Sequence, residues 1–200
     1  MKKILSVALL IAAMPAMAED FAGKPFTPQA VQAVLSCKSS SLDFLYWGTN
    51  FTGPNEKAEK NKGRFVNELN SLTYRYRLPF NVRLTNPLDK TEVEGRYVVF
   101  RTSKEIYLEI DWSKYPKLHK LYQQKQIEAV QGLTRMLERK NVATKDLQTL
   151  GYDIPAKEQH IDDPSKTIKV NKYFGFSAMS KGDFTTEILD KGYIGCRYPQ

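Results

Sequence analysis

Alternation between large apolar and charged side chains first becomes clear in residues 72–79, LTYRYRLP. Successive side chains of a β-strand point to opposite faces of the sheet. The even positions from 74 to 78 are tyrosine, tyrosine and leucine, whereas the odd positions are Arg75 and Arg77. The segment therefore predicts a strand with one apolar face and one basic face.

Further strands are expected on both sides of a helical region. Apolar alternation and turn residues predict strands at residues 80–85, 96–102, 105–111, 167–179, 184–190 and 193–198. The links between consecutive strands are short, with turns expected at 180–183 and 191–192. Short links favour antiparallel pairing.

Helical spacing of apolar residues appears before and between the strand-rich segments. It predicts an N-terminal helix at 27–38 and a long central helix at 111–141. Residues 41–48 fit either a strand or a second short helix. We expect a shorter helix at 144–151 and a polar connector at 153–166.

The order of these elements predicts an α+β fold. We expect an antiparallel sheet made of two strand-rich segments, about 72–111 and 167–198, with the N-terminal and the long central helix packed on one side. Residues 19–200 show no repeat and no linker, and they suffice to bury one hydrophobic core. The sequence therefore predicts a single domain over 19–200.

The first 18 residues predict a signal peptide. Lys2 and Lys3 precede an apolar run, and Ala16-Met17-Ala18 provides a cleavage site of small residues. The apolar run is too short to span about 30 Å of hydrocarbon. We expect cleavage near Ala18 and a periplasmic or secreted product without a later transmembrane span.

The chain contains two cysteines, Cys37 and Cys196. Thiols of an exported chain tend to pair in an oxidising compartment. The C-x-x-C spacing of a catalytic dithiol is absent. We therefore predict a structural disulfide that joins the first helix to the last strand; two buried free thiols are the alternative.

The sequence carries no motif of a known catalytic class. It lacks a Gly-x-Ser-x-Gly elbow, a phosphate loop, a Rossmann fingerprint and a His-Glu-x-x-His pair. His160, Asp162 and Asp163 lie close enough in sequence to suggest metal ligands, but an acidic turn explains them better. We expect no catalytic residue, no metal site and no cofactor.

Glu105, Glu109 and Asp111 share one face of a predicted strand. Paired carboxylates can hydrolyse glycosides, but a catalytic acid needs partial desolvation. The alternation of these carboxylates with apolar residues predicts that this face is exposed. We therefore interpret them as a polar outer face.

Basic residues form the stronger signal. The chain has a net charge of +8, and its cations are concentrated in residues 57–104 and 112–145. The residues expected to contact an anionic partner come from the predicted strands and the long helix: Arg75, Arg77, Arg83, Lys117, Lys120 and Lys125. Arginine binds carboxylate and phosphate groups bidentately. A solvated basic face is the alternative.

These features favour an exported, non-catalytic binding protein of the bacterial envelope. Its expected partner is a protein or an anionic envelope polymer, and the role of an inhibitor or an immunity-type protein fits this class. Nucleic acid is not expected as a partner outside the cytoplasm. Two alternatives remain: an envelope hydrolase using Glu109 and Asp111 or the His160 cluster, and a carrier of an apolar ligand. The oligomeric state is not predicted.

Overall fold

The computed structural model describes residues 26–57, 60, 62–70, 73–101, 104–137, 150–160, 162–163, 165–177 and 191–199. The predicted signal peptide lies outside the described residues. So do the expected strand 184–190 and the expected helical residues 144–149.

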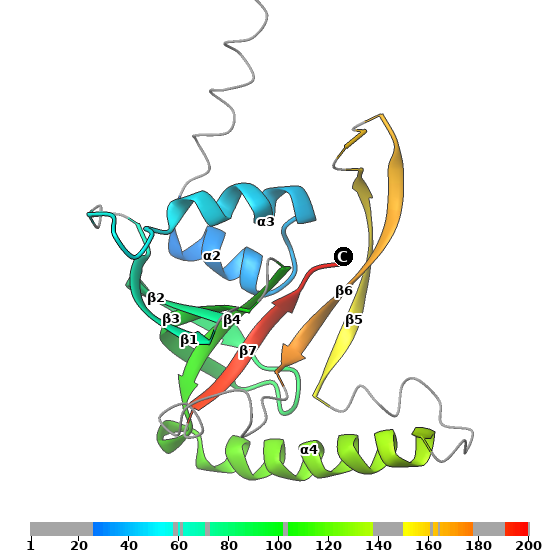
Figure 1. Ribbon diagram of the computed structural model, residues 1–200. Helices are drawn as coiled ribbons and strands as arrows, with labels where there is room; N and C mark the ends of the chain where they lie inside the picture. The colour runs from blue at the N-terminus through cyan, green and yellow to red at the C-terminus, as the bar shows by residue number, and fades with distance from the viewer. Residues whose placement is uncertain are drawn as a thin grey trace, which may run out of the picture.

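The described strands form one antiparallel sheet in the order β1-β2-β3-β4-β7-β6-β5. The strands are β1 (Arg64–Asn70), β2 (Thr73–Thr85), β3 (Glu92–Arg101), β4 (Glu105–Asp111), β5 (Gly151–Gln159), β6 (Thr167–Phe176) and β7 (Lys191–Arg197). Figure 1 shows a strongly twisted sheet from which the β5–β6 hairpin projects. The predicted α+β fold with an antiparallel sheet is confirmed.

The last strand lies between the two halves of the sheet. β7 pairs with β4 on one side and with β6 on the other. Lys191 and Gly192 already pair with Asp111 and Ile110, so the turn expected at 191–192 is wrong. Ladder hydrogen bonds to β4 extend the strand to these residues, although their local composition is that of a turn.

The polar connector expected at 153–166 is also wrong, because β5 occupies Gly151–Gln159. β5 is an edge strand whose side chains are mostly exposed. An edge strand with little burial has no apolar alternation to mark it in the sequence. Pairing with β6 along its whole length, rather than apolar patterning, fixes this strand.

The free edge of β5 is interrupted by a proline. Leu150 accepts a hydrogen bond from the N–H of Phe176, and His160 donates to the carbonyl of Lys166. Even positions of β5 therefore turn their backbone groups toward β6, and odd positions such as Pro155 turn theirs outward. Proline has no N–H, so the edge lacks a donor near its middle, which disfavours the addition of another strand.

Two short helices pack on one face of the sheet. They are α2 (Pro28–Leu35) and α3 (Ser41–Trp47), followed by the 3-10 turn η1 (Gly48–Asn50). Thr27 caps α2 by accepting a hydrogen bond from the N–H of Ala30, so the N-terminal helix is confirmed. Ser40 caps α3, which decides between the two alternatives for 41–48 in favour of a helix.

Aromatic rings fill the space between these helices and the sheet. Phe44 stacks on Tyr198 with ring centroids 4.4 Å apart. Phe51 contacts Tyr76 and Phe100, with centroids 4.7 and 4.8 Å away. The apolar face predicted for residues 74–78 therefore does face the core, although Tyr74 is 38% exposed.

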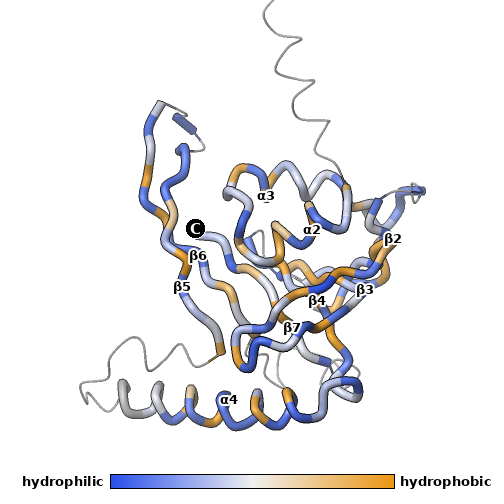
Figure 2. The backbone as a smooth tube through the Cα atoms, turned by 180° about the vertical axis from the view of Figure 1, so that it is seen from behind, coloured by the Kyte–Doolittle hydropathy of each residue, from blue (hydrophilic) through white to orange (hydrophobic). Residues whose placement is uncertain are grey.

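The long helix α4 (Pro116–Leu137) follows the 3-10 turn η3 (Trp112–Lys114) and crosses the end of the strands (Figures 1 and 2). Leu118 joins the same core as α2 and α3. Tyr122 packs against Trp112 and Phe176. The helices therefore contribute to one core on one side of the sheet, as predicted. Among the described residues, no helix combines the length and apolar character needed to cross a bilayer.

The predicted disulfide is present. Cys37, which follows α2, is bonded to Cys196 of β7, and the two α-carbons are 5.2 Å apart. The phenol of Tyr198 donates to the carbonyl of Val34 at 2.8 Å and adds a second link between the same segments. Disulfides persist in oxidising compartments, and the structure is thus consistent with an extracytoplasmic location.

A buried ion pair holds the β5–β6 hairpin to the turn between α2 and α3. Lys172 donates to Glu158 at 2.9 Å and to the carbonyl of Ser39 at 2.7 Å, and both charged side chains are buried. Glu158 also accepts a hydrogen bond from the N–H of Ser41. Burial opposes the negative charge, but these bonds outweigh it and lower the pKa of Glu158.

The double variant Cys37→Ser/Cys196→Ser should unfold at a lower denaturant concentration than the oxidised protein. The bridge closes a loop with a sequence separation of 159. Chain entropy then gives a loss of up to about 5 kcal/mol in the free energy of unfolding. Urea titration measures this loss. A reductant should destabilise the wild type but not the variant, because the variant has no disulfide to reduce. Equal midpoints for the variant and the oxidised wild type would contradict a stabilising bridge.

Candidate functional site

Glu109 lies on the outer face of the sheet, which is the face turned away from α2 and α3. The alternation in β4 predicted that this carboxylate is exposed, but it is only 7% exposed. Tyr97 of β3 and Tyr193 of β7 are its cross-strand neighbours. The prediction is wrong because large side chains of neighbouring strands cover this row of the outer face.

Arg75 and Glu109 form a bidentate ion pair. Nε of Arg75 donates to Oε2 of Glu109 and Nη2 donates to Oε1, both at 2.8 Å. The guanidinium also lies 4.1 Å from the centre of the Tyr97 ring. Two bonds and a stacked ring hold the guanidinium in one orientation.

The charge of Arg75 is firmly retained in this setting. Burial opposes the charge, but the hydrogen bond and attraction of Glu109 outweigh it and raise the pKa of the guanidinium. Nε and Nη2 each make one bond to Glu109. A guanidinium has five N–H donors, and within the described part of the chain the Arg75 guanidinium makes no hydrogen bond besides these two. The remaining donors are available to a ligand.

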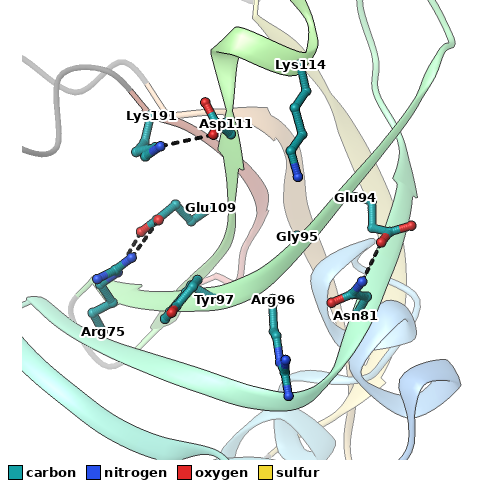
Figure 3. Close-up of a pocket in the computed structure, with 10 residues that line it drawn as sticks. All are labelled: Arg75, Asn81, Glu94, Gly95, Arg96, Tyr97, Glu109, Asp111, Lys114 and Lys191. Carbon is teal, nitrogen blue, oxygen red and sulfur yellow. Dashed lines mark hydrogen bonds and ion pairs between the residues drawn. The ribbon is translucent and has the colours of Figure 1, made fainter.

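These donors belong to a hollow of about 260 Å³ on the outer face. The hollow is lined by Arg75, Asn81, Glu94, Gly95, Arg96, Tyr97, Glu109, Asp111, Lys114 and Lys191. Figure 3 shows that these side chains come from β2, β3, β4, η3 and β7. Cations and carboxylates thus alternate around one opening.

Each carboxylate of the hollow is bonded to a neighbour. Glu109 holds Arg75, as described above. Asp111 accepts from the N–H and the hydroxyl of Ser113 and lies 3.4 Å from Lys191. Glu94 accepts from Asn81 and from Arg83.

Hydrogen bonds from Ser113 and the proximity of Lys191 lower the pKa of Asp111. Hydrogen bonds from Arg83 and Asn81 lower the pKa of Glu94. A general acid requires a shift in the opposite direction.

The cations Arg96 and Lys114 differ in how they are engaged. Arg96 donates to the carbonyls of Leu78 and Pro79, where the register between β2 and β3 shifts. Lys114 extends from η3 into the hollow (Figure 3). Within the described ranges it makes no hydrogen bond or ion pair. Lys114 and the remaining donors of Arg75 therefore offer positive charge to an incoming group.

The structure does not bring the six predicted basic residues together in this hollow. Arg75 lines it, whereas Arg83 is exposed and pairs with Glu94 at its rim. Arg77 is exposed on β2 outside the hollow. Of the α4 residues, Lys117 and Lys120 are exposed and Lys125 pairs with Glu128 at 2.6 Å; none lines the hollow.

Sequence reasoning missed Arg96, Lys114 and Lys191 as site residues. Lys191 fell in an expected turn, and Lys114 fell within the expected long helix. Alternation within β3 could not have identified Arg96, because it places Arg96 on the same face as the core residues Val98 and Phe100, whereas the Arg96 side chain is exposed. No local signal shows that β7 returns beside β4 and brings Lys191 to Asp111.

His160, Asp162 and Asp163 lie in the turn between β5 and β6. The imidazole of His160 accepts from the N–H of Asp162, and Asp163 accepts from Ser165 and pairs with Lys166. Across the described ranges, no group of three or more His, Cys, Asp or Glu side chains is placed to hold a metal ion. The cluster is a hairpin turn.

Comparisons of the chain with protein-family models, with curated proteins and with solved structures found no match.

Arg75→Ala should lower the free energy of unfolding by about 3–5 kcal/mol, because it leaves the buried Glu109 carboxylate unpaired. The double variant Arg75→Met/Glu109→Leu should recover most of this loss, because it removes both charges. Arg83→Ala, which breaks an exposed pair, is the matched control and should change stability little. Urea titration of the wild type and the three variants measures these free energies of unfolding. Equal losses for Arg75→Ala and Arg83→Ala would contradict a structural role for the buried ion pair.

Proposed function

We propose that this chain is an exported, non-catalytic binding protein that recognises an anionic group of a protein or an envelope polymer. The binding site is the hollow around Arg75 and Lys114. One observation carries the proposal: Glu109 and Tyr97 fix the Arg75 guanidinium while part of its donors remain available in the hollow.

A fixed guanidinium binds an anion at a lower entropic cost than a mobile one. Ordering a flexible side chain costs roughly 0.5–1.5 kcal/mol on binding, and Arg75 has already lost that freedom in the folded chain. Its planar donors suit carboxylate and phosphate groups. Tyrosine and arginine are also enriched among the residues that dominate binding energies at protein interfaces.

The absence of catalysis is part of the proposal. The carboxylates of the hollow serve as acceptors for structural donors, and the pKa values of Asp111 and Glu94 are lowered. This supports a role in orienting cations rather than in transferring protons. An envelope hydrolase using Glu109 and Asp111 is the competing function.

The location is supported by the disulfide and by the predicted leader. Cys37–Cys196 is consistent with an oxidising compartment, and residues 1–18 have the pattern of a signal peptide. A periplasmic inhibitor or immunity-type protein fits both features. A carrier of apolar ligands is less well supported, because charged and polar side chains line the hollow.

The test compares the full chain with Lys114→Glu, which reverses the charge of the cation that has no described partner. Both are immobilised and exposed to an envelope fraction at low salt. We expect the wild type to retain a macromolecule that elutes as salt rises, because exposed ion pairs are screened. Lys114→Glu should retain at least about tenfold less, a loss of roughly 1.4 kcal/mol.

The control is Lys169→Glu, an equal charge reversal at an exposed position of β6 away from the hollow. It should retain as much as the wild type. If Lys114→Glu and Lys169→Glu retain equal amounts of the macromolecule, the hollow is not its binding site. If the wild type hydrolyses peptidoglycan, phospholipid or nucleic acid and Glu109→Gln does not, the protein is an envelope hydrolase and the proposed function is wrong.

A further inference from the structure

A second hollow adjoins the first. It measures about 340 Å³ and is lined by Pro28, Gln29, Gln32, Asn81, Val82, Arg83 and Glu94. Asn81 and Glu94 line both hollows. They are hydrogen-bonded to each other, and Figure 3 shows this pair at the side of the first hollow nearest the helices. The two hollows meet at this pair, and their lining extends from Lys191 on β7 to Gln29 and Gln32 on α2; we refer to both hollows together as the groove.

The backbone of β2 and β3 shapes this groove. The register shifts between Arg77 and Val82, so β2 bulges at this point. Gly95 opposes the bulge, and a Cβ atom there would lie 2.2 Å from the carbonyl oxygen of Glu109. Only glycine permits this close approach of β3 to β4. The floor of the groove therefore carries no side chain at position 95.

Positive charge exceeds negative charge along the groove. Its cations are Arg75, Arg83, Arg96, Lys114 and Lys191, and its carboxylates are Glu94, Glu109 and Asp111. Amide side chains lie at the middle and at the α2 end: Asn81, Gln29 and Gln32. Amides both donate and accept hydrogen bonds, as the backbone of a bound peptide requires.

We propose that the groove binds an extended acidic peptide segment of a partner protein. One acidic side chain of the segment occupies the hollow of Arg75 and Lys114, and a second lies beside Arg83. This inference rests on the proposed function and names the class of its partner. The segment lies across β2, β3 and β4, where the lining residues of the groove are, rather than along a sheet edge. At the β5 edge, Pro155 disfavours the addition of a strand.

A peptide suits the groove better than a polyphosphate. The carboxylates of Glu94, Glu109 and Asp111 stand among the cations and repel a densely charged polyanion along its length. An acidic peptide places single negative charges apart and offers N–H donors between them. Those donors can bond to Glu94 or to the amides of Gln29 and Gln32.

Calorimetric titration of the full chain at low salt tests the proposal with four probes. These are blocked peptides of six glutamates and of six lysines, N-acetylglutamate amide, and tripolyphosphate. We expect the glutamate peptide to bind, the lysine peptide not to bind, and the other two probes to bind at least about tenfold more weakly. Loss of one charged hydrogen bond weakens binding by roughly tenfold or more. Lys114→Gln and Arg83→Gln should therefore each weaken binding of the glutamate peptide by that factor.

Lys169→Gln is the matched control and should leave the affinity unchanged. If N-acetylglutamate amide binds as well as the long peptide and Arg83→Gln has no effect, the extended groove is refuted while the Lys114 site stands. If tripolyphosphate binds more tightly than the glutamate peptide, the peptide class is refuted. If no probe binds but the wild type retains an envelope component that Lys114→Glu does not retain, only this inference is refuted. If no probe binds and no envelope component is retained, the proposed function is refuted too.

Discussion

The pairing of β7 on both of its sides holds the core and the candidate site together. β7 lies between β4 and β6, so it joins the N-terminal and C-terminal halves of one sheet. Its buried face carries Cys196, which is bonded to the segment after α2. Its outer face carries Tyr193 beside Glu109 and Lys191 beside Asp111. The same strand therefore closes the core and completes the candidate site.

The regular part of the fold could be predicted from the sequence because burial leaves a pattern. Alternation marks β2, β3, β4 and β6, and helical spacing and caps mark α2 and α4. β5 leaves no such pattern, because it is an exposed edge strand whose position depends on its pairing with β6. Pairing between distant segments is a tertiary property that local composition does not encode.

The candidate site was predicted only in part, for a related reason. Alternation correctly places Glu109 on the face opposite the core, but it does not reveal what covers that face. Tyr97 and Tyr193 belong to neighbouring strands, and their packing converts an expected exposed carboxylate into a buried partner of Arg75. The basic signal led to Arg75, whereas Lys114 and Lys191 needed the sheet order to be recognised as its neighbours.

Glu109 holds the Arg75 guanidinium in a fixed orientation, and the proposed binding of an anion depends on it. The most direct measurement is the exchange of arginine Nε–H protons with solvent by ¹⁵N NMR at neutral pH, with the Arg75 signal assigned from Arg75→Lys. We expect an Arg75 Nε–H that exchanges slowly in the wild type and fast in Glu109→Gln. The Nε–H of the exposed Arg77 should exchange fast in both proteins. An Arg75 Nε–H that exchanges as fast as that of Arg77 in the wild type would contradict a fixed orientation of the guanidinium.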